Sequence, residues 1–212
     1  MKNLKKIAAL VLASVMAFNM AGCAMGGKLS PKKLAASAKK NGCELIKDAD
    51  DFADMIEDGE DLEDGAYITV TGKDSKGVFK SNDILTDFYD SSIKSATIVA
   101  MCDDDHTYYA FLVCMSFASK KDATDYYEDM VDGAEDIEDT GYDVEFDDGE
   151  EKGITYTLAA ANVGIANICE GIYLSGSNVY AVIGYGYGSV DDYEDCFEDI
   201  GGCYDVTLPS EL

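Results

Sequence analysis

Five runs rich in β-branched and aromatic residues constrain the fold of this chain more than any other feature. Residues 97–101 and 108–117 flank a short acidic turn, and residues 168–174 and 179–187 flank a short polar one, so each pair predicts a hairpin. A further strand is expected at residues 154–160. Strands joined by short turns pair antiparallel, and we therefore predict a single antiparallel sheet.

A helix is expected to follow each hairpin. Ser119 lies three residues before Asp122, close to the capping-box pattern, and apolar residues then recur at helical spacing over residues 120–137. Ser189 stands in the equivalent place after the second hairpin, ahead of an apolar stripe that ends at Ile200. A sheet must have its apolar face covered, so the predicted fold class is α+β, with two layers, an antiparallel sheet and helices on one face.

The two hairpin-plus-helix units also share a short sequence similarity. Residues 109–112 align with residues 180–183 at an offset of 71. We interpret this match as a sign of two repeat halves at about residues 95–140 and 154–203. Chance similarity is the alternative.

The first part of the domain predicts shorter elements. Ser30 followed by Pro31 is typical of a helix start, and Asn41-Gly42 is typical of a helix end, so we predict a helix over residues 31–40. We also expect a strand at residues 43–46, a helix at 51–57, a strand at 67–71, a polar turn from Gly72 to Gly77 and a helix at 82–93.

The charge of the chain excludes one class of function. The chain has 42 acidic residues against 16 basic ones, all of them lysine, and its formal net charge is −26. Phosphate backbones repel such a polyanion, so we expect no nucleic-acid partner. Because 47% of the residues are apolar, the chain can still bury a core, and we expect a single acidic domain over residues 30–212.

The N-terminus predicts a secretory signal. Lys2, Lys5 and Lys6 precede an apolar run over residues 7–18, which is the order of a charged segment and a hydrophobic segment in signal peptides. A membrane-spanning helix needs about 20 apolar residues, and this run is too short for one.

The sequence that ends this run is Met20-Ala21-Gly22-Cys23. It resembles the lipobox of bacterial lipoproteins, in which an apolar residue and two small residues precede a cysteine, and the chain as a whole resembles small uncharacterised lipoproteins of Gram-positive bacteria. The resemblance implies that a diacylglyceryl group is attached to the Cys23 thiol and that the signal peptide, residues 1–22, is removed. Residues 23–29 would form a short tether, with the protein on the extracytoplasmic face of the cell membrane. An ordinary signal peptide with an incidental cysteine is the alternative.

Basic residues gather just after this cysteine. Residues 23–47 contain six lysines and one acid, a net charge of +5, whereas residues 48–212 have a net charge of −34. Basic residues close to an anionic membrane are attracted to it. One interpretation is that the lysine segment lies toward the lipid headgroups, and the other is that it is the solvated face of a helix.

No catalytic or metal site is expected. The acids invite a calcium interpretation, but neither Asp48-Ala49-Asp50 nor residues 143–151 fits the spacing of a calcium-binding loop, so we interpret these acids as solvated loops. His106, the single histidine, follows three aspartates at a predicted hairpin tip, where such residues commonly form turns. We predict no catalytic residue, no metal ligand and no cofactor.

Two further features stay open. Six cysteines besides Cys23 allow disulfides in an oxidising compartment; we favour buried thiols for most, with Cys196 and Cys203 as the candidate pair. In residues 184–188, glycine and tyrosine alternate, which places the glycines on one side of a strand, either for close contact with a neighbouring element or as the floor of a groove.

These observations predict a lipid-anchored, extracytoplasmic and non-enzymatic lipoprotein. Its role would be binding of an unidentified protein or small molecule, or a structural role at the cell surface. Two alternatives are an accessory protein that binds a cation or a small neutral ligand, and a hydrolase that depends on a pair of carboxylates.

Overall fold

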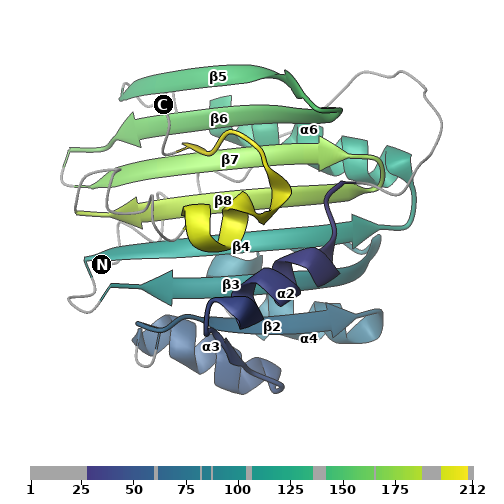
Figure 1. The fold of residues 1–212 in the computed structure, drawn as a ribbon, viewed down its shortest axis with the longest axis vertical. Helices are drawn as coiled ribbons and strands as arrows, with labels where there is room; N and C mark the ends of the chain where they lie inside the picture. Colours follow the sequence, from purple (N-terminus) through teal and green to yellow (C-terminus); the bar gives the residue numbers. More distant parts are fainter. Residues whose placement is uncertain are drawn as a thin grey trace.

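The structure is a computed structural model that describes residues 28–59, 62–81, 83–86, 88–103, 107–135, 142–164, 166–187 and 197–209 (Figure 1). These residues form an eight-stranded sheet in the order β1-β2-β3-β4-β8-β7-β6-β5. The strands are β1 (Glu44–Leu45), β2 (Ala66–Thr71), β3 (Ile93–Cys102), β4 (Tyr108–Phe117), β5 (Asp143–Glu151), β6 (Ile154–Asn162), β7 (Asn167–Ser175) and β8 (Asn178–Gly186). Only β1 and β2 pair in parallel within this sheet, which confirms the predicted α+β class with an antiparallel sheet.

The helices precede, separate and follow these strands in the sequence. They are α2 (Pro31–Lys40), α3 (Ala49–Asp58), α4 (Lys73–Ser81), α5 (Asp83–Thr86), α6 (Lys120–Glu135) and the 3₁₀-helix η2 (Gly201–Tyr204). The prediction for residues 31–40 is confirmed, with Ser30 at the N-cap and proline in the first turn. The prediction for residues 51–57 is confirmed as α3, which ends at Gly59 in the left-handed conformation that favours glycine.

Both predicted hairpins are present, and they meet in the middle of the sheet. β3 pairs with β4 and β7 pairs with β8, while β4 and β8 pair with each other from Tyr108–Gly186 to Ser116–Asn178. The second hairpin turns at Gly176, whose φ of 63° is in the region that favours glycine. The sheet therefore joins segments about 70 residues apart in sequence.

Helices cover both faces of the sheet, so the prediction of two layers with helices on one face is wrong. α2 and the C-terminal segment lie in front of the sheet in Figure 1, whereas α4 and α6 lie behind it. Along β3, Ile98 packs on the α6 side and Val99 on the α2 side. The reason is visible in β4, which is apolar at almost every position, because a strand buried on both faces does not alternate.

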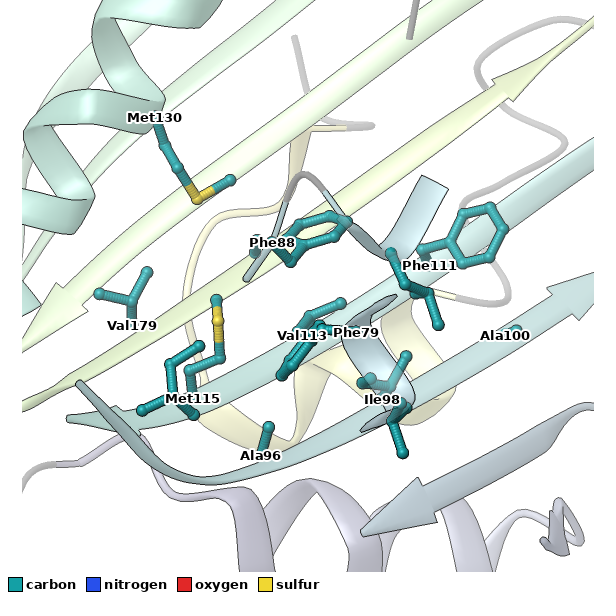
Figure 2. Close-up of a cluster of buried hydrophobic side chains, with 14 of the residues drawn as sticks. Phe79, Phe88, Ala96, Ile98, Ala100, Phe111, Val113, Met115, Met130 and Val179 are labelled. Carbon is teal, nitrogen blue, oxygen red and sulfur yellow. The ribbon is translucent and has the colours of Figure 1, made fainter. Parts of the chain in front are cut away.

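Two large hydrophobic clusters result, one on each face, and a small third cluster includes Val163 and Ile168. The α6-side core includes Phe79, Phe88, Ile98, Val113, Met115 and Met130 (Figure 2). The α2-side core includes Leu34, Val99, Leu112, Tyr180 and Phe197. Figure 2 shows the two phenylalanines, from the α4 and α5 region, over β3 and β4, with Met130 reaching in from α6.

The two hairpin-plus-helix units share their order of elements, but their helices lie on opposite faces. α6 packs on the side of Phe111, whereas the segment with Phe197 and η2 packs on the side of Leu112. The aligned residues Tyr109 and Tyr180 also point to opposite faces, since Tyr109 packs against the α6-side core and Tyr180 belongs to the α2-side core. The register has this effect, because Tyr109 pairs with Tyr185, which is an odd number of positions from Tyr180, and side chains alternate along a strand.

Two predictions for residues 72–93 are wrong. The segment expected to be a polar turn forms α4, in which Val78 and Phe79 are buried. Gly77 costs about 1 kcal/mol in a helix, but burying a phenylalanine contributes about 1.5–3 kcal/mol and outweighs it. The helix expected over residues 82–93 is reduced to the four residues of α5, since the Asp90 carboxylate accepts a hydrogen bond from the Ser92 N–H (2.7 Å) in a turn before β3.

The predicted capping box at the start of α6 provides a test of the fold. The Ser119 hydroxyl accepts a hydrogen bond from the Asp122 N–H (3.1 Å) and donates one to the Asp122 carboxylate (2.8 Å). We expect Ser119→Ala to lower the free energy of unfolding by about 1 kcal/mol, whereas Ser119→Thr retains most of it. Urea denaturation measures the difference, and equal stability of all three proteins would show that this cap does not hold α6.

Candidate functional site

The structure places only some of the residues singled out in the sequence. Cys23, His106 and Cys196 lie outside the described residues. Cys203 lies half-buried in η2, and its pairing with Cys196 stays a prediction. The buried cysteines are Cys43, Cys102, Cys114 and Cys169. Burial raises the pKa of Cys114 and of Cys169 to about 12, so both stay protonated at neutral pH, as expected of thiols in a core.

Asp103 organises the turn between β3 and β4. Its carboxylate accepts hydrogen bonds from the backbone N–H groups of Thr107 (2.6 Å) and Tyr108 (3.0 Å) and from the Thr107 hydroxyl (2.5 Å). Partial burial opposes ionisation, but these hydrogen bonds outweigh it and hold the pKa of Asp103 below its ordinary value. These hydrogen bonds join the end of β3 to the start of β4, and the rest of the predicted turn, residues 104–106, lies outside the described residues.

The acidic residues 143–151 form β5 at the edge of the sheet, which corrects their interpretation as a loop. Six of the nine residues are acidic, and the strand pairs with β6 on one side. Charged residues on an edge strand oppose pairing with further strands, because two such edges repel each other. Within the described residues, no group of three acids, cysteines or histidines is placed to hold a metal ion.

Gly184 and Gly186 lie on one face of β8 and Tyr185 on the other, as predicted for this part of residues 184–188. A Cβ at Gly186 would lie 2.4 Å from the Thr107 carbonyl oxygen and 2.5 Å from the Tyr108 Cα atom, so this glycine admits the backbone of the neighbouring strand. Tyr185 stacks on Tyr109 on the other face, with 5.3 Å between ring centroids. These contacts favour close approach of elements over an open groove.

An open pocket of about 570 Å³ lies between α6 and the edge of the sheet. It is lined by Tyr127, Val131, Phe146, Asp148, Gly149, Thr155, Tyr156 and Thr157. The hydroxyl groups of Tyr127 and Thr157 lie 2.8 Å apart and satisfy each other, and burial raises the pKa of the Tyr127 phenol. The exposed Asp148 adds the one carboxylate of the lining, beside hydroxyl groups and aromatic side chains.

The most unusual polar group is Glu170, in the middle of β7. Its cross-strand neighbours are Ala159 on β6 and Ile183 on β8, both on the α6 side of the sheet. The side chain is only 2% exposed, and neither carboxyl oxygen has a hydrogen-bond partner in the part of the chain that the structure describes. An unpaired buried polar group costs about 1–3 kcal/mol, so a hydrophobic residue would be more stable at this position.

Burial alone raises the pKa of Glu170 to about 8. The carboxyl group is therefore protonated over most of the acidic and neutral range. The sequence analysis missed this residue, although the alternation along β7 places it in line with Ile168 and Ile172, which face the core. The signal in the sequence was a glutamate at a strand position whose side chain faces the core.

A second pocket, of about 480 Å³, separates α2 from the C-terminal segment. The Ser37 hydroxyl donates to the Ile200 carbonyl oxygen (2.9 Å) and the Asn41 amide donates to the Asp199 carbonyl oxygen (2.5 Å). The Lys33 ammonium lies 5.3 Å from the centre of the Tyr204 ring. These contacts fix α2 against the domain and leave a groove with lysines on one wall and Glu198 and Asp199 on the other.

Comparison with known proteins identifies no family. No protein-family model and no curated protein matches the chain. Among solved structures, the extracellular domain of PknH from Mycobacterium tuberculosis is similar over 84% of this chain and 93% of its own length, with 12% sequence identity and a TM-score of 0.41. A likeness this distant carries no argument about function. None of the described helices is both long enough and apolar enough to cross a membrane.

Glu170 predicts a specific dependence of stability on pH. Its pKa is raised in the folded state, so the protonated form stabilises the fold at low pH, and this contribution is lost as the pH rises from about 4.5 to about 8. Relative to Glu170→Gln, we expect the wild type to lose on the order of a few kcal/mol over that interval and to change little above it. Urea denaturation at a series of pH values measures this difference.

The exposed Glu150 on β5 provides the matched control for this comparison. Glu150→Gln should follow the wild type, because both retain Glu170. Parallel curves for the wild type and Glu170→Gln would contradict the assignment of a proton to the buried carboxyl group.

Proposed function

We propose that this protein is a lipid-anchored, extracytoplasmic lipoprotein whose acidic α+β domain binds a partner or has a structural role at the cell surface, without catalysing a reaction. The observation that carries the proposal is the order of a lysine-rich start, an apolar run over residues 7–18 and then Met20-Ala21-Gly22-Cys23. Two or more acyl chains on Cys23 would hold the protein stably on a membrane, since each buried methylene contributes about 0.8 kcal/mol.

The residue at which the described domain begins agrees with an order of signal peptide, Cys23 and then the domain. Leu29 is fully buried, the Thr97 hydroxyl donates to the Pro31 carbonyl oxygen (2.9 Å), and the Tyr204 hydroxyl donates to that of Ser30 (2.6 Å). The domain therefore holds the chain from Leu29 onward. Cys23 lies six residues before Leu29 in the sequence, so cleavage before Cys23 would leave the described domain whole.

The polar groups of the domain support a non-enzymatic role. A hydrolase of the kind considered above needs two carboxylates facing one cavity. Glu170, the buried acid among the side chains that the structure describes, lines neither pocket. The second pocket has the carboxylates of Glu198 and Asp199, but these residues are consecutive and exposed on one wall, so they do not flank a substrate bond from two sides. The Asp103 carboxylate and the Tyr127 and Thr157 hydroxyls have their hydrogen bonds within the fold.

The anchor is tested by Cys23→Ser in the full chain, produced in a bacterium that processes lipoproteins. We expect the wild type to enter the detergent-rich phase in a Triton X-114 partition and the variant to stay in the aqueous phase, because the variant has no thiol to acylate. Cys203→Ser, at a half-buried cysteine of the domain, should behave like the wild type. Intact mass spectrometry of the wild type that showed a bare thiol and an uncleaved leader would contradict the proposal.

The pocket beside α6 favours a second candidate function, binding of a small cationic ligand. The Asp148 carboxylate would pair with an ammonium group, in a pocket whose Tyr127 and Thr157 hydroxyls keep their hydrogen bond to each other. The large negative charge of the whole domain would also raise the local concentration of any cation.

This second function is tested by thermal denaturation with ethanolamine as the probe and ethylene glycol as its neutral counterpart, at matched ionic strength. We expect ethanolamine to raise the midpoint of the wild type and not that of Asp148→Asn; a ligand at 100 times its dissociation constant adds about 2.7 kcal/mol. Asp54→Asn, at an exposed acid of α3, controls for general charge effects. Equal shifts in both variants would show nonspecific association.

A further inference from the structure

We propose that the outer side of α2 is the surface of the domain that lies on the anionic headgroups of the membrane. This inference rests on the proposed lipid anchor and adds an orientation to it. The surface consists of Lys32, Lys33, Lys39 and Lys40, all exposed, and is called here the α2 lysine face. The occupant is an anionic bilayer, recognised by charge.

The fold fixes which side of α2 faces outward. Leu34 and Ala38 are fully buried against the sheet, and α2 contacts β2, β3 and β4. The hydrogen bonds of Ser37 and Asn41 to the C-terminal segment fix the rotation of α2 about its own axis. At 3.6 residues per turn, Lys32 and Lys39 then flank the outward side at one edge and Lys33 and Lys40 at the other, with the exposed Ala36 between them.

The charge on this helix is the opposite of that on the rest of the domain. No acidic residue lies within α2, and residues 23–47 have a net charge of +5 against −34 for residues 48–212. An anionic surface attracts the first segment and repels the second, so the electrostatic energy is lowest with α2 toward the lipid. Glu198 and Asp199 line the groove on one side of α2, together with Lys33 and Lys40. Lys32 and Lys39 lie at the other edge of the helix, away from these two acids.

The short segment between Cys23 and the domain keeps α2 close to the anchored end of the chain. Only residues 24–28 separate Cys23 from Leu29, which is buried in the domain. Six residue steps span at most about 22 Å when fully extended, and screened attraction between charges extends over about 8–10 Å. α2 begins two residues after Leu29, so it is the helix nearest to the anchor along the chain.

The experiment uses the acylated full-length product on vesicles of phosphatidylcholine, either alone or mixed equally with phosphatidylglycerol. Exposed amines are acetylated with a water-soluble reagent, and the rate at each lysine is measured by mass spectrometry of peptides. We expect acetylation of Lys32, Lys39 and Lys40 to be about fivefold slower on the anionic vesicles. Lys76 on α4 and Lys121 on α6 should react equally on both, since they lie on the opposite side of the sheet.

A quadruple variant isolates the contribution of the lysines. For the wild type we also expect slower acetylation of Lys28, which precedes α2, on the anionic vesicles. In Lys32→Gln, Lys33→Gln, Lys39→Gln, Lys40→Gln, this protection of Lys28 should disappear. The matched control replaces Lys76, Lys80, Lys120 and Lys121 by Gln and should keep it. Circular dichroism checks that both variants are folded.

The outcomes separate this inference from the anchor itself. If the wild type does not float with either kind of vesicle, the lipid anchor is wrong and the orientation falls with it. If it floats with both but its α2 lysines react equally on both, the anchor stands and the orientation is overturned. Protection that persists in the quadruple variant also overturns it.

Discussion

The pairing of β4 with β8 is the interaction on which the rest of the structure depends. It joins two hairpins distant in sequence and places Leu112 opposite Val182 at the centre of the sheet. Both strands are buried on both faces, so the same ladder supports the α6-side core through Val113 and Ala181 and the α2-side core through Leu112 and Val182. A one-residue slip would exchange the side chains presented to the two cores, and the two sets differ in size and polarity. Packing against both cores therefore specifies the register of β4 and β8.

The features that the sequence predicted correctly are those encoded within a few neighbouring residues. Ser30-Pro31 and Ser119 mark helix starts, and the polar turns mark hairpins, because capping and turn geometry are satisfied locally. The prediction failed where distant segments decide. α4 forms because Phe79 reaches a core built by β3 and β4, and residues 143–151 form a strand because β6 offers an edge. The covered second face depends on α2 and on residues from 197 onward, which no local pattern brings together.

The acids of this protein act on stability in two distinct ways. Surface acids repel one another and are solvated, so each contributes little and their sum is screened by salt. Glu170 is buried and has no hydrogen-bond partner among the described residues, so protonation is what removes the cost of burying its charge. Both contributions weaken the fold as the pH rises, and only the second is confined to one residue. Composition shows the first contribution, whereas the second follows only from the place of Glu170 on the core side of β7.

The arrangement of the two faces links the proposed anchor to the proposed binding role. α2 and the C-terminal segment cover one face of the sheet, and α4, α5 and α6 cover the other. With the α2 lysine face on the headgroups, the sheet separates the lipid from the pocket formed by Tyr127, Phe146 and Asp148. That pocket and the acidic edge strand β5 then lie away from the bilayer charge, where a soluble partner can reach them. A domain held by α2 would present the acids of α6 outward, because α6 covers the opposite face of the sheet.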